Sequence, residues 1–295
     1  MFRGLFVALM SLTYAACAIA QESAPANAHD EVPLILEGNF AQGGIIRGHT
    51  DPGAEVRFGE HQLLVSEDGT FVFGLGRNHA ANDNVTIILP DGRSEVRPFD
   101  VATREYVIQR VEGLPQEYVT PPEERLARIA AERATKWEAR QPLSPRLGFA
   151  QDFIWPATGP ISGTYGSQRF YNGEPRNPHM GIDVAAPTGT PVLAPADGVV
   201  TLADPDMYFE GGLIFIDHGH GMIDVFMHLS EVLVEVGQEV SQGDTIGLVG
   251  ASGRATGPHL DWRMYVMGER VDPANLVGPM PTPEEDDAAT GQGGE

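Results

Sequence analysis

Short apolar runs separated by glycine dominate residues 31–103. Val56-Arg57-Phe58 alternates apolar and polar side chains, as expected for a strand with one buried face. Leu63-Leu64-Val65 and Thr70-Phe71-Val72-Phe73 flank Asp68-Gly69, a dipeptide typical of β-hairpin turns. We therefore predict a small β-domain over residues 31–103, a sandwich for which an immunoglobulin-like arrangement is one option.

Residues 146–280 show the same kind of pattern with longer apolar runs. Leu213-Ile214-Phe215-Ile216 and Thr245-Ile246-Gly247-Leu248-Val249 are examples, and glycines separate the runs. This pattern is typical of antiparallel sheets. The predicted fold class is therefore mostly β, with two β-domains.

The pattern changes between the two domains, in residues 104–145. Thr120 precedes two prolines and Glu123, which favours a helix that begins with a threonine N-cap and a capping box. The following residues are rich in Ala, Arg and Glu, and their apolar stripe is narrow. We predict a largely exposed linker helix, with a partner-binding helix as the alternative.

The two ends of the chain indicate export and a disordered tail. Residues 1–20 combine Arg3, an apolar run and Ala18-Ile19-Ala20, as in a cleaved signal peptide, so the mature chain has no predicted membrane span. The expected location is the periplasm, and a lipoprotein anchored through Cys17 is the less favoured alternative. Residues 281–295 form an acidic tail that is predicted to be disordered.

Charge and cysteine content narrow the possible chemistry. The chain has 41 acidic and 19 basic residues and a formal charge of −22, which disfavours nucleic-acid binding and electrostatic docking to membranes. Its single cysteine, Cys17, lies in the predicted signal peptide. Disulfides, cysteine nucleophiles and cysteine metal sites are therefore not expected in the mature protein.

Histidines and aspartates recur in three segments of the second domain. His179 and Asp183 are four residues apart, and His259 and Asp261 are two apart, so each pair shares one face of an extended segment. His228 lies between them in Phe226-Met227-His228-Leu229. Imidazole nitrogens and carboxylate oxygens are common zinc ligands, so the three segments together predict a metal site.

Residues 155–273 resemble the lysostaphin/LytM family of zinc endopeptidases, a group that includes Gly-Gly endopeptidases. The matching motifs occur in the family's order: Pro178-His179-Met180-Gly181-Ile182-Asp183, Asp217-His218-Gly219-His220-Gly221, Phe226-Met227-His228-Leu229-Ser230, and Thr256-Gly257-Pro258-His259-Leu260. The resemblance implies an antiparallel β peptidase domain and one zinc ion per chain.

The resemblance also implies roles for individual residues. His179 and Asp183 would bind zinc, and His228 and His259 would be catalytic. The third ligand of the family is the second histidine of a His-x-His pair, and this chain has Asp261 there. An aspartate can still bind zinc, but it makes the centre formally neutral instead of singly positive, so we expect slower catalysis or a higher pH optimum and a site that also accepts manganese.

Three further residues are weaker candidates for contacts near the site or with substrate: His218, Tyr165 and Arg169. For Tyr165 and Arg169, a packing role is an equally good interpretation.

The predicted function is an exported zinc metalloendopeptidase that hydrolyses peptide cross-links of bacterial peptidoglycan. Zinc-activated water would attack the peptide carbonyl, with His228 and His259 assisting. The alternative is a catalytically weak or inactive LytM-like factor that activates cell-wall amidases. In that case residues 31–145 would contact an amidase or a division partner.

Overall fold

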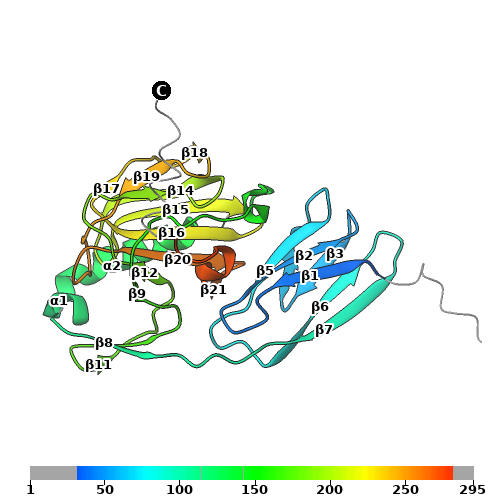
Figure 1. Cartoon of the computed structure of the whole chain (residues 1–295), viewed down its shortest axis with the longest axis horizontal. Helices are drawn as coiled ribbons and strands as arrows, with labels where there is room; N and C mark the ends of the chain where they lie inside the picture. Colours follow the sequence, from blue (N-terminus) through cyan, green and yellow to red (C-terminus); the bar gives the residue numbers. More distant parts are fainter. Residues whose placement is uncertain (1–31, 114, 142, 282–295) are drawn as a thin grey trace, which may run out of the picture. The chain divides into compact units, whose positions relative to one another are not determined.

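The computed structural model describes residues 32–113, 115–141 and 143–281 (Figure 1). The predicted signal peptide, Cys17 and nearly all of the predicted acidic tail lie outside the described residues. Over the described chain, no helix has both the length and the apolar character needed to cross a bilayer. The predicted mostly-β fold class is confirmed, as the order of elements shows.

Two sheets form the first β-domain. One consists of β1 (Leu34–Gly38), β2 (Ile45–Thr50) and β5 (Thr70–Gly74). The other consists of β3 (Glu55–Phe58), β4 (His61–Leu63), β6 (Asn82–Ile88) and β7 (Ser94–Asp100). Buried residues of both sheets share one hydrophobic cluster, as expected for a sandwich.

The two Asp-Gly turns of this domain have different consequences. Asp91-Gly92 joins β6 and β7 in an antiparallel hairpin, and Gly92 has a φ of 89°. Asp68-Gly69 also forms a turn, but the predicted hairpin around it is wrong, because β4 pairs with β3 while β5 pairs with β2. The chain therefore crosses from one sheet to the other at this turn. Local turn chemistry cannot distinguish a hairpin from such a crossing.

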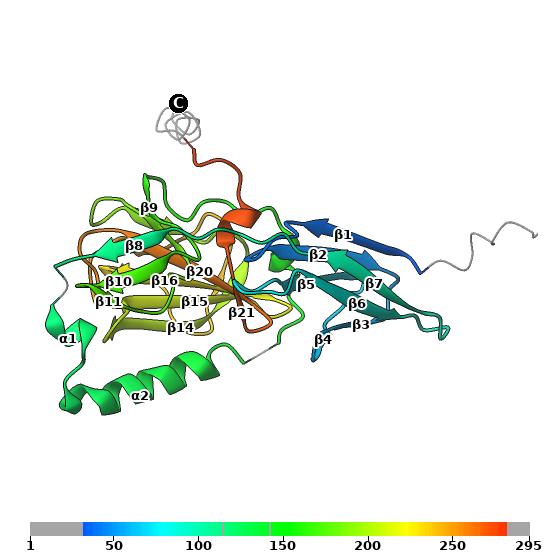
Figure 2. The same ribbon diagram turned by 90° about the horizontal axis from the view of Figure 1, so that it is seen from below.

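The linker contains a strand as well as helices. It has β8 (Ile108–Val111), α1 (Gln116–Val119) and α2 (Glu123–Glu138) (Figure 2). The predicted threonine N-cap is wrong: Thr120 is the C-cap of α1, and α2 begins after Pro122 without a side-chain cap. No residue of α2 is buried, and the helix is held by polar contacts such as Lys136 Nζ to Glu210 Oε1 at 2.6 Å.

A large antiparallel sheet forms the centre of the second domain. Its order is β18-β14-β15-β16-β20-β12-β9, and β21 pairs with β20. The bounds are β9 (Ile161–Gly163), β12 (Ile182–Val184), β14 (Gly198–Met207), β15 (Gly211–Gly219), β16 (Met222–Leu229), β18 (Glu239–Val240), β20 (Leu260–Val266) and β21 (Glu269–Val271). Two short 3-10 helices flank these strands in the sequence: η1 (Gly148–Ala150) precedes β9, and η2 (Pro273–Leu276) follows β21.

Two smaller sheets flank the large one. One has the order β13-β19-β17, from β13 (Pro191–Leu193), β17 (Glu231–Val232) and β19 (Thr245–Leu248). The other has the order β11-β10-β8, from β10 (Gln168–Tyr171), β11 (Glu174–Pro175) and the linker strand β8. The parallel pairing of β8 with β10 places Gln109 opposite Arg169.

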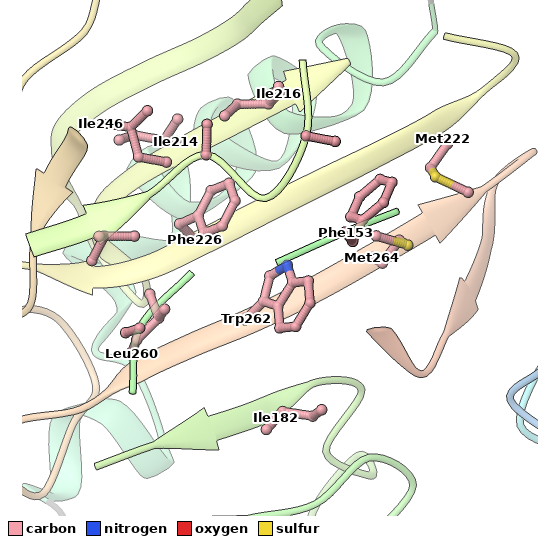
Figure 3. Close-up of a cluster of buried hydrophobic side chains, with 14 of the residues drawn as sticks. Phe153, Ile182, Ile214, Ile216, Met222, Phe226, Ile246, Leu260, Trp262 and Met264 are labelled. Carbon is pink, nitrogen blue, oxygen red and sulfur yellow. The ribbon is translucent and has the colours of Figure 1, made fainter. Parts of the chain in front are cut away.

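The apolar runs fill both faces of the large sheet. Ile214 and Ile216 of β15 join one buried cluster, and Leu213 and Phe215 join another, as the period of two in a strand requires. Figure 3 shows the first cluster, in which Phe226 of β16 lies between Ile214 of β15 and the side chains of Leu260 and Trp262 on β20. Both faces of the sheet are therefore covered, and polar side chains on its strands need partners.

Substitution of Phe226 tests how much this cluster contributes to the free energy of unfolding. Its side chain is fully buried, so Phe226→Ala should lower the free energy of unfolding by about 3–5 kcal/mol. The matched change Leu126→Ala on the exposed helix α2 should alter it by less than about 0.5 kcal/mol. Urea unfolding of both variants measures the difference, and equal effects would show that the cluster does not dominate stability.

Candidate metal centre

The candidate site is built on a cross-strand pair of aspartates. Asp183 of β12 and Asp261 of β20 are direct partners in the antiparallel ladder, and both are buried. Directly opposed residues on one face have Cβ atoms about 5 Å apart, and like charges there destabilise a sheet. Two buried carboxylates in this position need positive charge nearby.

His179 completes the group from the segment before β12. Its backbone N–H donates to Ser167 O at 2.8 Å, and its carbonyl accepts from Gly166 N at 2.7 Å. Its Nε2 lies 3.1 Å from Asp183 Oδ1 and 3.4 Å from Asp261 Oδ2. These are close approaches without hydrogen-bond geometry: both ring nitrogens of His179 and Oδ1 of Asp183 are buried and have no hydrogen-bond partner among the residues that the structure describes.

The spacing of these atoms fits a divalent cation. One ligand atom from each of the three residues lies within 4.8 Å of the others. Tetrahedral zinc with ligands at about 2.1 Å sets neighbouring ligand atoms about 3.4 Å apart. His179 Nε2 therefore lies close to this distance from one oxygen of each aspartate.

Two arginines contact the same carboxylates. Arg263 donates from Nε to Asp261 Oδ1 at 2.9 Å and from Nη2 to Asp261 Oδ2 at 2.7 Å, a bidentate pair. Arg169 donates from Nη2 to Asp183 Oδ2 at 2.5 Å. Gly181 leaves room for this arrangement, since a Cβ there would lie 2.4 Å from Cγ of Arg263.

Charge pairing determines the protonation of the group. Burial alone raises the pKa of Asp261, but Arg263 and His179 outweigh it and hold the pKa well below its usual value. Burial lowers the pKa of His179, but Asp261 and Asp183 raise it by more than burial lowers it, so the pKa lies above its usual value. Burial and the charge of Asp261 raise the pKa of Asp183, but His179 and Arg169 outweigh them and lower it. Both carboxylates are therefore ionised near neutral pH, as metal ligands must be.

His228 and His259 lie together beside this group. Their rings are 4.8 Å apart, and both line a groove of about 140 Å³ together with Asp183, Arg169 and other residues. His228 Nδ1 lies 2.9 Å from Ser252 O, and His259 Nδ1 lies 2.8 Å from Gly257 O. A carbonyl only accepts hydrogen bonds, so each Nδ1 carries a proton, and in the neutral tautomer of each ring the lone pair is on Nε2.

The other candidates from the sequence lie elsewhere, apart from Arg169. His218 on β15 is fully buried, and its ring is bonded to Asp224 Oδ2 at 3.1 Å and Asp197 O at 2.8 Å. Tyr165 is buried and donates to Arg270 O at 2.7 Å. Neither side chain lines the groove of His228 and His259.

Sequence reasoning missed Arg263 and Gln109. Arg263 is two residues after Asp261 on β20, so the period of two that joined His259 to Asp261 also predicts that Arg263 shares the face of Asp261. Gln109 accepts from Arg169 Nε at 3.0 Å. No local signal identifies Gln109, because its role depends on the parallel pairing of β8 with β10.

Comparison with known proteins identifies the family. Residues 177–273 match the family described as Peptidase family M23. A crystal structure described as a putative peptidase M23 from Pseudomonas aeruginosa is 32% identical, with a TM-score of 0.64 over 81% of this chain and 95% of that one. The chain therefore belongs to peptidase family M23, and the predicted family resemblance is confirmed.

Curated relatives share mainly the second domain. The peptidoglycan DD-endopeptidase ShyA of Vibrio cholerae is 44% identical over 103 residues, 35% of this chain and 24% of that protein. The cell division protein DipM of Caulobacter vibrioides is 34% identical over 161 residues, 55% of this chain and 25% of that protein. The chain thus spans about a quarter of the length of these relatives.

The buried ring of His228 predicts a pH-dependent component of stability. Burial lowers its pKa in the folded protein to about 4, so the unfolded chain binds the proton at higher pH. The neutral, buried ring of His228 therefore contributes about 3 kcal/mol to the free energy of unfolding. This contribution is fully present above about pH 6.5 and is lost as the pH falls toward 4.

Unfolding free energies of the wild type and of His228→Gln, measured from pH 7 to pH 4, isolate this component. The wild type should lose about 3 kcal/mol more than the variant over that interval. Parallel pH profiles would contradict a neutral buried His228.

Proposed function

We propose that the chain is an exported metalloendopeptidase that hydrolyses peptide cross-links of bacterial peptidoglycan. One divalent cation, zinc or alternatively manganese, is held by His179, Asp183 and Asp261. His228 and His259 act on the substrate and on water in the adjoining groove. The peptidoglycan DD-endopeptidase relative and the predicted signal peptide support this substrate and a periplasmic location.

One observation carries the proposal: unpartnered ligand atoms lie beside two histidines with free Nε2 atoms. His179 Nε2 and Asp183 Oδ1 are buried, without hydrogen-bond partners, and 3.1 Å apart. Leaving such atoms unpaired costs about 1–3 kcal/mol each, and a cation between them removes that cost. His259 Nε2 lies 3.9 Å from Asp183 Oδ1, so this position adjoins the groove.

The histidines supply the proton transfers. When bound, a zinc ion would polarise the peptide carbonyl and lower the pKa of water. The two Nε2 lone pairs can accept a proton from the attacking water, and a protonated ring can then donate to the oxyanion or to the leaving amine. Because the pKa of His228 is lowered to about 4, His228 is neutral and ready to accept at neutral pH.

Arg263 changes the charge expected from the aspartate ligand. Its bidentate contact makes Asp261 and Arg263 together formally neutral, like the histidine that the family has at this position. Arg169 compensates Asp183 in the same way, so a divalent cation among both aspartates and both arginines keeps two formal positive charges. The lower Lewis acidity expected from Asp261 alone is thus offset, although a shared carboxylate is also a weaker ligand.

The same arginines favour the alternative function. Arg263 and Arg169 already neutralise Asp261 and Asp183, so the group can persist without a metal ion. A metal-free groove would suit a factor that activates cell-wall amidases, with residues 31–145 available for an amidase or division partner. The cell division protein DipM among the relatives is consistent with such a role.

Asp261→Asn tests the metal site and the activity together. The purified protein should bind one equivalent of zinc and release muropeptides from peptidoglycan, and chelator should abolish the release. The variant should bind zinc at least about tenfold more weakly, because an amide is a poorer ligand than a carboxylate. Asp206→Asn, at a side chain 86% exposed, should behave as the wild type.

Metal content and muropeptide release decide between the two functions. A metal-free wild type that releases nothing but stimulates an added amidase would contradict the hydrolase and favour the activating factor.

Arg263→Gln tests the competition between arginine and metal. Removing the guanidinium frees both oxygens of Asp261, so zinc affinity should rise at least about tenfold. Arg176→Gln removes the same charge from an arginine paired with Glu174 instead, and should leave the affinity within about twofold. Competition with a chromophoric chelator measures both, and equal affinities would show that Arg263 does not oppose the metal.

A further inference from the structure

Arginines gather beside the candidate site in an otherwise acidic protein. The chain has 19 basic residues against 41 acidic ones. One pocket of about 180 Å³ is nevertheless lined by five arginines and by no aspartate or glutamate: Arg169, Arg176, Arg254, Arg263 and Arg270. We call this the arginine pocket. Such local positive charge against the charge of the whole chain indicates a site for an anion.

Only three of the five arginines have carboxylate partners. Arg169 pairs with Asp183 and Arg263 with Asp261, while Arg176 pairs with Glu174 outside the pocket lining. Among the described residues, Arg254 and Arg270 form no ion pair within 4.0 Å: the side chain of Arg270 donates to Tyr265 Oη at 3.2 Å, and that of Arg254 makes only ring contacts. Two of the five guanidinium groups therefore have no carboxylate in ion-pair contact within the described part of the chain.

Arg254 is held in place by aromatic rings. Its guanidinium carbon lies 5.1 Å from the ring centre of Tyr171 and 4.6 Å from that of Phe209. These cation–π contacts hold the side chain, and no residue in the described ranges accepts a hydrogen bond from its N–H groups. Arg254 is half-buried, and this burial lowers the pKa of its guanidinium. An anion bound there would form charge-assisted hydrogen bonds in a partly desolvated setting.

The arginine pocket adjoins the groove of the candidate metal centre. Arg169, Tyr171 and Arg254 line both cavities. The groove also contains Asp183, His228 and His259, and the arginine pocket contains His179. A ligand that fills both cavities would place its anionic group one side chain away from the groups that act on the peptide bond.

We propose that the arginine pocket is a subsite for a free carboxylate of an acidic peptide, bound next to the peptide bond in the groove. This inference rests on the proposed function, because it specifies the substrate of the same site. Arg254 and Arg270 bind the carboxylate, and the planar guanidinium of Arg254 suits a bidentate contact.

The charge of the chain favours a small peptide over a polyanion. A net charge of −22 repels every charge of a nucleic acid or of an anionic membrane surface that approaches the protein. A single carboxylate is repelled weakly, since charges beyond about 8–10 Å are screened at physiological ionic strength. The local charge that such a ligand meets inside the pocket then comes mainly from Arg254 and Arg270, the two arginines without a carboxylate partner among the described residues.

Binding of synthetic dipeptides to metal-depleted protein tests the subsite without hydrolysis. N-acetyl-D-alanyl-D-alanine carries a free C-terminal carboxylate, and its C-terminal amide lacks one. A third probe, N-acetyl-D-alanyl-D-glutamic acid with its C-terminus amidated, carries the carboxylate on a side chain. NMR titrations should show at least one acid binding about tenfold more tightly than the neutral amide, and the better acid identifies the source of the carboxylate.

Arg254→Gln should reduce this preference for the acid to less than about twofold without changing binding of the amide. Arg270→Gln, at an exposed position, is a second variant and should also weaken binding of the acid. Arg57→Gln removes an exposed arginine of β3 and is the control, with wild-type affinities expected.

Equal binding of acid and amide by the wild type would overturn the subsite, as would inorganic phosphate binding there more tightly than either acid. A protein that discriminates acid from amide but releases no muropeptides would contradict the hydrolase while leaving the subsite intact. The two proposals therefore fail separately.

Discussion

Two buried carboxylates face each other across a pair of β-strands, and the rest of the site follows from this constraint. Asp183 and Asp261 are ladder partners, so their side chains cannot separate without breaking the sheet. Like charges in that position are destabilising, and burial increases the cost. His179, Arg169 and Arg263 surround the pair and supply the charge that the two aspartates require.

The compensation is distributed over separate parts of the chain. Arg263 comes from the same strand as Asp261, whereas Arg169 belongs to β10 and is oriented by Gln109 of the linker strand β8. The linker therefore helps to position a ligand of the candidate centre. This arrangement ties the shape of the site to the pairing of β8 with β10, and it makes the linker more than a passive spacer.

The resemblance to the lysostaphin/LytM family implied the joint ligand set of His179, Asp183 and Asp261. The mostly-β fold and the shared faces within each His/Asp pair were predicted from local periodicity. Residues two or four apart in extended chain share a face, whatever the tertiary fold. Prediction from the sequence failed where long-range pairing decides: the turn at Asp68-Gly69 crosses between sheets, and Gln109 reaches the site through a parallel strand.

Arg263 could be predicted only in part. Its spacing from Asp261 places both on one face of a strand, but the need for a guanidinium there follows from the pairing of Asp183 with Asp261, which the sequence does not show. The net charge of the site therefore cannot be predicted from the motif residues alone, because Arg263 lies outside the motifs.

The central claim is that the two carboxylates and His179 share one divalent cation. Anomalous diffraction from zinc-soaked crystals, recorded at the zinc absorption edge, tests it most directly. A zinc ion shared by the three residues should give a single strong peak about 2.0–2.2 Å from His179 Nε2, Asp183 Oδ1 and Asp261 Oδ2. No peak between these atoms at saturating zinc, with the bidentate contact of Arg263 unchanged, would contradict it.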